Sequence, residues 1–201
     1  MKYLPGTIGL PLILSIEKYG HIKWYVDAEF GVHKYMSNHT GGFMTMVSRG
    51  AYVESKKLKF NTKSSTEAER VVVDNVMIKG IWNRYFLKEQ GYEIHENIIN
   101  QYNQSAIKLE NNGRKSSSMQ TLHINIIYYL ITDRITKQEA YVFICTNLDM
   151  IMDYFTKTLQ GSQFRHFRNI TLGIHEDYIP SYIVSGIEMP EERKIPPDID
   201  K

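Results

Sequence analysis

One acidic residue, Asp27, lies where a strand could hold it rigidly beside a metal ion. In the segment Ile22–Phe30 the even positions are all apolar, whereas Lys23, Asp27 and Glu29 fall on the odd positions. This period-two alternation predicts a strand with one buried face. A strand anchored in a core holds an acidic side chain steadily above the sheet. We interpret Asp27 as one member of an acidic metal site whose other members come from later in the chain.

A second carboxylate, Glu67, lies at the start of a predicted helix. Ser64 followed three residues later by Glu67 is a capping box, and the helix is expected to end near residue 90, before Gly91. The expected apolar stripe of this helix comprises Val71, Ile78, Trp82 and Tyr85. Glu67 precedes Val71 by four residues and therefore lies on the same side of the helix. Glu67 is thus either a capping partner, which the pattern alone favours, or a carboxylate directed at the sheet.

The remaining periodicities predict an α/β domain. Strands are expected at 22–30, 42–47, 51–55, 96–102 and 140–145, and helices at 64–90, from 103, at 121–135 and at 148–159. Short links between the first three strands imply an antiparallel meander, and the later helices imply crossover connections. We therefore predict a mixed five-stranded sheet, with three antiparallel strands followed by two parallel strands and helices on both faces. Sites in such sheets gather near strand ends.

The composition is ordinary for a soluble globular protein. The chain has 201 residues, 42% of them apolar and 23% charged, which suffices for one domain with a sizeable core. The net charge of +2 does not by itself indicate a nucleic-acid binder. A single cysteine excludes an internal disulfide and fits an intracellular compartment, cytoplasmic or nuclear. The apolar run near the N-terminus is broken by prolines and glycines and is too short for a membrane span, so we expect no membrane partner.

Six short segments follow one another in an order that resembles a known family. They are Tyr3–Thr7, Trp24–Ala28, Ser64–Glu69, Asn103–Ile107, His123–Ile126 and Asp153–Lys157. Together they resemble the ribonuclease H domain of copia-type retrotransposon polyproteins, from about residue 3 to residue 160. The resemblance implies a ribonuclease H-like domain at 21–160, preceded at 1–20 by a connector from a lost or separate reverse transcriptase region. Prolines and charges after Gly173 predict that 161–201 is a helix turn followed by a disordered tail.

The resemblance implies hydrolysis of the RNA strand of RNA–DNA hybrids. In that family four carboxylates hold two Mg²⁺ (or Mn²⁺) ions, which activate water and stabilise the leaving oxygen. Matching the motifs makes Asp27, Glu67 and Asp153 the catalytic and metal-binding residues, with Asp149 as a rival to Asp153. The remaining position, where the family has Asp, is Tyr102, whose protonated phenol is a poor magnesium ligand. We therefore expect impaired hydrolysis and weak metal binding; the alternative is a non-catalytic remnant that only binds hybrid or has no activity.

Basic residues gather in two places that could contact substrate. They are Lys56, Lys57, Lys59 and Lys63 before the long helix and Arg114 and Lys115 in a later loop. A solvated basic face is the ordinary explanation of such clusters. The functional interpretation is contact with the phosphates of a hybrid, which would be salt-sensitive and independent of sequence. The expected partners are RNA–DNA hybrid and a reverse transcriptase region of the same polyprotein.

Overall fold

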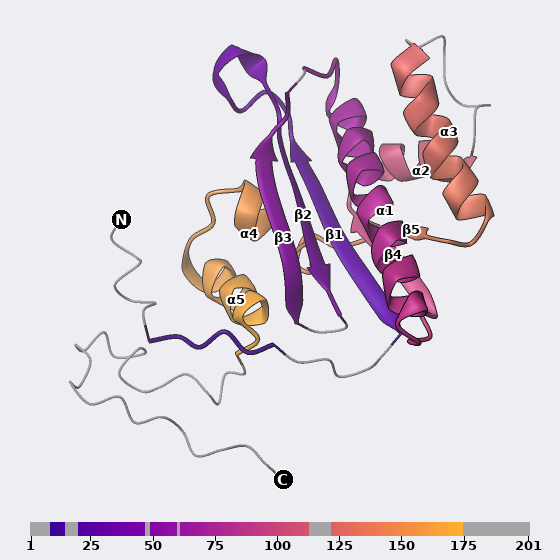
Figure 1. Ribbon diagram of the computed structural model, residues 1–201. Helices are drawn as coiled ribbons and strands as arrows, with labels where there is room; N and C mark the ends of the chain where they lie inside the picture. The colour runs from indigo at the N-terminus through magenta and orange to yellow at the C-terminus, as the bar shows by residue number, and fades with distance from the viewer. Residues whose placement is uncertain (1–8, 15–19, 47–48, 60, 113–121, 175–201) are drawn as a thin grey trace.

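The computed structural model describes residues 9–14, 20–46, 49–59, 61–112 and 122–174 (Figure 1). Its strands are β1 (His21–Glu29), β2 (His39–Thr45), β3 (Gly50–Lys57), β4 (Glu96–Gln101) and β5 (Tyr141–Ile144). Its α-helices are α1 (Ser65–Glu89), α2 (Gln104–Asn112), α3 (Leu122–Thr136), α4 (Asp153–Thr156) and α5 (Gly161–Leu172). A short 3-10 helix, η2 (Lys34–Met36), lies between β1 and β2.

The strands form one sheet in the order β3-β2-β1-β4-β5. β1 pairs with β2 and β2 pairs with β3 in antiparallel fashion, whereas β4 is parallel to both β1 and β5. Antiparallel neighbours need only short links, but each parallel strand is reached through a helical crossover, α1 before β4 and α2 with α3 before β5. The predicted mixed five-stranded sheet is confirmed, and its central strand is β1.

Helices cover both faces of this sheet, as predicted (Figure 1). On one face, Trp24 and Val26 of β1 lie in a core built with α1 and α3. On the other face, Phe43 of β2 packs in a second core with Met152 and with Phe167 of α5. Each of these five side chains is at most 1% exposed, and burying one contributes roughly 1.5–3 kcal/mol. Because Phe167 belongs to the second core, the packed part of the chain continues beyond the expected boundary at residue 160.

The buried side of α1 differs from the one that we predicted. Val72 and Val76 are 2% and 0% exposed and belong to the core under the helix. Ile78, Trp82 and Tyr85 were expected there but are 53%, 63% and 47% exposed. The prediction holds for Val71, which is 4% exposed, and is wrong for these three residues. The reason is that α1 carries apolar residues on both sides, so periodicity alone does not identify the side that faces the sheet.

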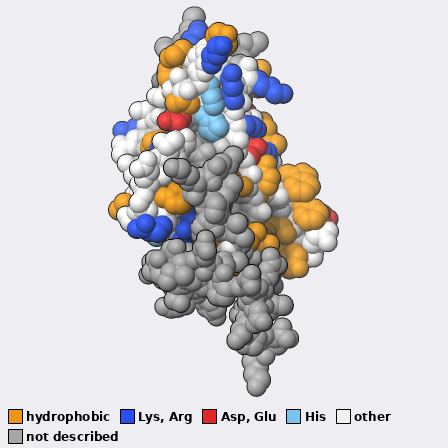
Figure 2. All heavy atoms as spheres, turned by 90° about the vertical axis from the view of Figure 1, so that its left-hand side faces the viewer, with side chains coloured by type: hydrophobic (Ala, Val, Ile, Leu, Met, Phe, Trp, Pro, Cys, Tyr) orange, Lys and Arg blue, Asp and Glu red, His pale blue; other side chains and the backbone are white. Residues whose placement is uncertain are grey.

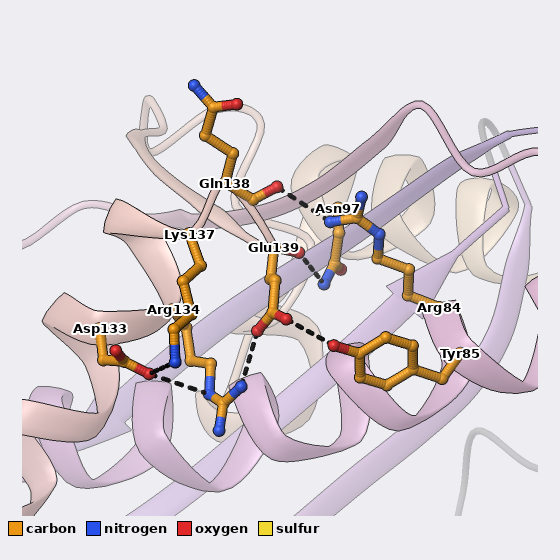
Figure 3. Close-up of polar contacts among 8 residues, drawn as sticks. All are labelled: Arg84, Tyr85, Asn97, Asp133, Arg134, Lys137, Gln138 and Glu139. Carbon is orange, nitrogen blue, oxygen red and sulfur yellow. Dashed lines mark hydrogen bonds and ion pairs between the residues drawn. The ribbon is translucent and has the colours of Figure 1, made fainter.

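A polar network ties the C-terminal half of α1 to the turn before β5 (Figure 3). The Glu139 carboxylate accepts hydrogen bonds from the Tyr85 hydroxyl of α1 at 2.5 Å and from the Arg134 guanidinium of α3 at 2.8 Å. The Glu139 backbone carbonyl accepts one from the Asn97 side chain of β4 at 3.2 Å. The hydrogen bonds from Tyr85 and Arg134 lower the pKa of Glu139. The Glu139 side chain therefore links α1 to α3, and its backbone carbonyl links this turn to β4.

The C-terminal part does not form the single helix expected at 148–159. Leu148 is 76% exposed, and the chain forms turns until α4 begins at Asp153. The Ile13 backbone N–H donates to the Leu172 carbonyl at 2.8 Å, which ties the described N-terminal segment to the end of α5. The predicted disordered tail and much of the predicted connector lie outside the described residues. Within the part of the chain that the structure describes, no helix is long and apolar enough to cross a membrane.

Candidate acidic site at the end of the central strand

Asp27 lies near the C-terminal end of β1 and is fully buried, with 0% of its surface exposed. Its Oδ1 accepts a hydrogen bond from the Tyr102 hydroxyl at 2.7 Å, and its Oδ2 accepts one from the Thr156 hydroxyl of α4. Gly41 of β2 pairs with Asp27, and a Cβ at Gly41 would collide with the Met152 side chain. Glycine thus allows the segment that leads into α4 to approach the sheet. Three parts of the fold, namely β1, the end of β4 and α4, therefore meet at one carboxylate.

The Lys157 ammonium group lies among the oxygens of this site. Its Nζ donates to Asp153 Oδ1 at 2.7 Å and to the Tyr102 hydroxyl oxygen at 3.2 Å, and it lies 3.8 Å from Asp27 Oδ1. Burial acts to lower the pKa of Lys157, but the hydrogen bond to Asp153 and the charge of Asp27 outweigh burial and raise the pKa. Lys157 is therefore a permanent cation at neutral pH.

Tyr102 is a neutral member of the site. Burial raises the pKa of its phenol, and the negative charge of Asp27 raises it further. The hydroxyl can therefore donate a hydrogen bond to Asp27 but cannot act as an anionic ligand. Asp153 is 7% exposed and pairs with Lys157, whereas its rival Asp149 is exposed and accepts a hydrogen bond from Thr146 at 2.6 Å. Of the two aspartates, the structure brings Asp153 to the site.

Glu67 is not the helix carboxylate that reaches this site. Its side chain accepts a hydrogen bond from the Lys63 N–H at 2.7 Å, and its own N–H donates to Ser64 Oγ at 3.2 Å, which completes the capping box. Glu69 is only 3% exposed, and its pKa is raised well above the ordinary value by burial and then by the charge of Asp27. Side chains two positions apart in an α-helix point in directions that differ by about 200°, so Glu67 and Glu69 point to opposite sides of α1. The metal-binding expectation for Glu67 is therefore corrected: Glu67 caps the helix and Glu69 occupies the position predicted for it.

The side chains present do not fit a Mg²⁺ or Mn²⁺ centre in this arrangement. Glu69 Oε2 is buried and without a hydrogen-bond partner, which would suit a cation ligand. However, hydroxyl groups occupy both oxygens of Asp27, and an ammonium group is bound to Asp153. Mg²⁺ needs near-ideal octahedral oxygen coordination at about 2.0–2.1 Å. Among the described residues, no group of three or more His, Cys, Asp or Glu side chains is placed to hold a metal ion.

The predicted basic residues fall on two sides of the sheet. Lys56 pairs with Glu54 at 3.2 Å, and Glu54 also binds Lys79 of α1 at 2.5 Å, so Lys56 lies on the face that α1 covers. Side chains alternate along a strand, so Lys57 points to the opposite face, the one that holds Asp27. Lys57 also pairs in register with His39 of β2, at the same end of the sheet as Asp27. Lys57 is therefore directed toward the acidic site and Lys56 away from it.

The other predicted basic residues are less informative. Lys59 and Lys63 are exposed after β3. Arg114 and Lys115 lie outside the described residues. Figure 2 shows Lys and Arg side chains gathered with hydrophobic ones at the upper end of the molecule, beside exposed histidines.

The connection between β1 and β2 carries an exposed aromatic residue. Tyr35 and Met36 are 77% and 63% exposed and have φ angles of 64° and 57°, in the left-handed region that side-chain-bearing residues rarely adopt. Lys34 Nζ lies 5.0 Å from the centroid of the Tyr35 ring. The Asn61 side chain donates to the Tyr35 carbonyl at 3.2 Å, which fixes the loop against the segment that follows β3. Residues in such sparsely populated backbone regions persist only where the surrounding structure holds them, as the hydrogen bond from Asn61 does here.

Three residues of the site were missed from the sequence: Glu69, Thr156 and Lys157. Glu69 shares one helix side with Val72 and Val76, three and seven residues later, but the apolar residues on the other side of α1 gave a competing pattern. Thr156 and Lys157 lie in the same short segment as Asp153, but their contacts with Asp27 join parts of the chain that are far apart in sequence. No local pattern indicates such contacts.

Comparison with known proteins gives one match in sequence and several in fold. No family model matches the chain. The chain is 26% identical over 178 residues to the retrovirus-related Pol polyprotein from transposon TNT 1-94 of Nicotiana tabacum, a match that covers 88% of the chain and 13% of the polyprotein. The chain therefore spans only a small part of this relative.

Similar solved structures have low sequence identity. LC11-RNase H1, isolated from compost, is 9% identical with a TM-score of 0.48, over 64% of this chain and 86% of that one. The foamy viral protease-reverse transcriptase in complex with RNA/DNA hybrid is 12% identical with a TM-score of 0.45, over 82% of this chain and 21% of that one. The sequence match over 88% of the chain and the strand order β3-β2-β1-β4-β5 support a ribonuclease H-like domain of a retrotransposon Pol polyprotein.

Proposed function

We propose that this domain binds RNA–DNA hybrid and hydrolyses the RNA strand far more slowly than a site with a complete set of carboxylates. The observation that carries the proposal is the hydrogen bond of 2.7 Å from the Tyr102 hydroxyl to Asp27. At this position a neutral donor replaces the anionic oxygen that the resemblance implies. It also occupies one of the two Asp27 oxygens that would otherwise bind a cation.

The electrostatics of the site support impairment. Two-metal hydrolysis requires ligands that clamp two cations about 3.5–4 Å apart. Tyr102 contributes no charge, and its raised pKa keeps the phenol protonated throughout the neutral range. Burial and the charge of Asp27 raise the pKa of Glu69, which favours the neutral form of that carboxyl group as well. The other carboxyl groups of the site are Asp27 and Asp153, and Lys157 is bound to Asp153.

Hybrid binding is proposed for the edge of the sheet beside Asp27. Asp27 is paired across β2, through Gly41, with Ser55 of β3, and Lys57 follows Ser55 by two residues on the same face. Adjacent strands are about 4.8 Å apart, so Lys57 begins within roughly 12 Å of the acidic site. Phosphate contacts by exposed lysines provide affinity without sequence preference. Tyr35 adds an exposed ring on which an unpaired base could stack.

The proposed protein partner is a reverse transcriptase region of a Pol polyprotein, because reverse transcription produces the RNA–DNA hybrid. This proposal rests on the sequence match to the Pol polyprotein, which covers 13% of that polyprotein. The second candidate function, a remnant that binds hybrid without any turnover, predicts the same affinity but no product.

One assay separates these outcomes. Labelled RNA–DNA hybrid, double-stranded DNA and double-stranded RNA are titrated with the protein over a series of salt concentrations, and RNA cleavage is followed with Mg²⁺ and with Mn²⁺. We expect salt-dependent hybrid binding and only slow cleavage, because Lys157 competes with the metal ions that two-metal hydrolysis requires. Absence of hybrid binding at low salt would refute the proposed substrate, and cleavage as fast as that of a complete ribonuclease H would refute the proposed impairment.

A further inference from the structure

We infer that Lys157 is the resident cation of the acidic site, so that the folded domain places its own ammonium group between Asp27 and Asp153 and does not require a divalent metal. This inference concerns the same site as the proposed function and deepens it. It depends on the proposed function only for the expectation that a ribonuclease H-like site would hold metal ions.

The position of the ammonium group is set by three oxygens from three parts of the fold. Lys157 Nζ lies 2.7 Å from Asp153 Oδ1 in α4, 3.2 Å from the Tyr102 hydroxyl after β4, and 3.8 Å from Asp27 Oδ1 in β1. The Tyr102 ring also presents its face to the ammonium group, at 4.8 Å from the ring centroid. An ammonium group has three N–H donors and no acceptor, and two of these donors are used within the site.

The backbone holds Lys157 close to these oxygens. Lys157 follows α4 directly, and its N–H donates to the Asp153 carbonyl at 2.9 Å. The preceding residue, Thr156, donates its hydroxyl to Asp27 and so fixes the end of α4 against the central strand. The lysine side chain is 31% exposed, and the carboxylates of Asp27 and Asp153 are 0% and 10% exposed. Because the cation is covalently attached beside its binding site, it does not have to be captured from solution.

An ion pair elsewhere in the chain shows that this arrangement is more than helical spacing. Lys137 and Asp133 also lie four residues apart and are separated by 2.8 Å, but their side chains are 54% and 45% exposed. In the described part of the chain Lys137 makes no hydrogen bond to a tyrosine hydroxyl, unlike Lys157, and Asp133 lies on the surface of α3. The pair at Lys137 is an ordinary surface pair. It therefore serves as a control of matched spacing and distance.

A divalent cation would have to displace Lys157. Any ion bound by both Asp27 and Asp153 would lie within a few ångströms of Nζ, where two positive charges repel each other. Removing the ammonium group leaves buried carboxylates without a counter-charge, which raises the affinity of the site for a cation from solution. The natural chain and a variant that lacks the lysine should therefore respond differently to metal.

The test is the melting temperature of the protein without nucleic acid, measured in EDTA, in millimolar MnCl₂, and in NaCl of matched ionic strength. We expect no saturable response of the natural chain to Mn²⁺. Lys157→Met should melt at a lower temperature in EDTA and recover with Mn²⁺ along a saturation curve, because a ligand that binds only the folded state stabilises it by mass action. Lys157→Arg should remain insensitive to Mn²⁺, because it keeps a cation at the site. Lys137→Met should change little and show no response to Mn²⁺.

Two results would overturn the inference. One is a saturable Mn²⁺ response of the natural chain equal to that of Lys157→Met, which would mean that the site takes a divalent ion with the lysine present. The other is a folded Lys157→Met that does not respond to Mn²⁺, or whose response survives in the Asp153→Asn background. Since no hybrid is present, failure of the proposed hybrid binding would leave these measurements unchanged, and the two failures remain distinguishable.

Discussion

Replacing Tyr102 by Phe isolates the hydrogen bond on which the proposed function rests. The substitution removes one hydroxyl and keeps the ring that packs against Lys157. It deprives Asp27 Oδ1, in a carboxylate that is 0% exposed, of its donor at 2.7 Å. After the substitution, the Lys157 ammonium group lies near that oxygen, but its Nζ is 3.8 Å away, which is beyond hydrogen-bond distance.

The expected effect is a loss of stability. Hydrogen bonds to charged groups contribute about 1.5–3 kcal/mol, and the lower value applies here because Tyr102 is half-buried and water can approach. For a domain of this size, a loss of ~1.5 kcal/mol lowers the melting temperature by roughly 3–6 °C. Thermal and urea unfolding of Tyr102→Phe and the natural chain would measure this difference.

Tyr52→Phe is the matched control. The Tyr52 hydroxyl also donates to a carboxylate, that of Glu54, but at 3.4 Å and from a side chain that is 41% exposed. Its removal should change the free energy of unfolding by less than about 0.5 kcal/mol. If Tyr102→Phe costs no more than Tyr52→Phe, the Tyr102 hydroxyl does not stabilise Asp27 and the reasoning about the site is wrong.

Further predictions concern pH and hybrid binding. Burial raises the pKa of Glu110 from its ordinary 4.5 to about 8, so the folded state binds the proton more tightly than the unfolded state. The free energy of unfolding should therefore fall as pH rises between these two values. Glu110→Gln should flatten this part of a profile of melting temperature against pH, and an unchanged slope would contradict the assignment. Lys57→Ala should weaken hybrid binding and reduce the salt slope by about one phosphate contact, whereas Lys56→Ala, on the opposite face, should leave both unchanged. Tyr35→Ala should weaken binding of a hybrid with a single-stranded overhang more than that of a blunt hybrid, and equal losses would argue against stacking.

The sequence was sufficient for the fold and for the position of Asp27 near the end of the central strand. The alternation around Asp27 predicts a strand with one buried face. Strands joined by short links are antiparallel, whereas strands joined through helices are parallel, so the lengths of the connections predict the pairing. The position of Asp27 could be predicted because successive side chains of a strand point to opposite faces of the sheet, so the apolar residues on either side of Asp27 mark the buried face. Tyr102 could be singled out through the family resemblance, because it directly precedes the segment Asn103–Ile107, where the family has Asp.

The helix carboxylate could not be chosen correctly by the same means. Glu67 and Glu69 are both near the start of α1, and the exposed apolar residues Ile78 and Trp82 made the outer side of the helix resemble a core stripe. The buried side follows from packing against β1, which requires the sheet to be present. Lys157 was likewise missed, because its contacts with Asp27 and Tyr102 depend on three separate elements meeting in space.

The most direct test of the central claim is RNA–DNA hybrid cleavage by Tyr102→Asp, with Tyr102→Asn as the control for side-chain volume. The account predicts that Tyr102→Asp cleaves at least about tenfold faster than the natural chain in Mg²⁺ or Mn²⁺, which corresponds to ~1.4 kcal/mol of transition-state stabilisation, because it adds the missing carboxylate beside Asp27. Tyr102→Asn should show no such gain. Equal rates for both variants and the natural chain, in folded proteins that bind hybrid, would contradict the claim that Tyr102 limits hydrolysis.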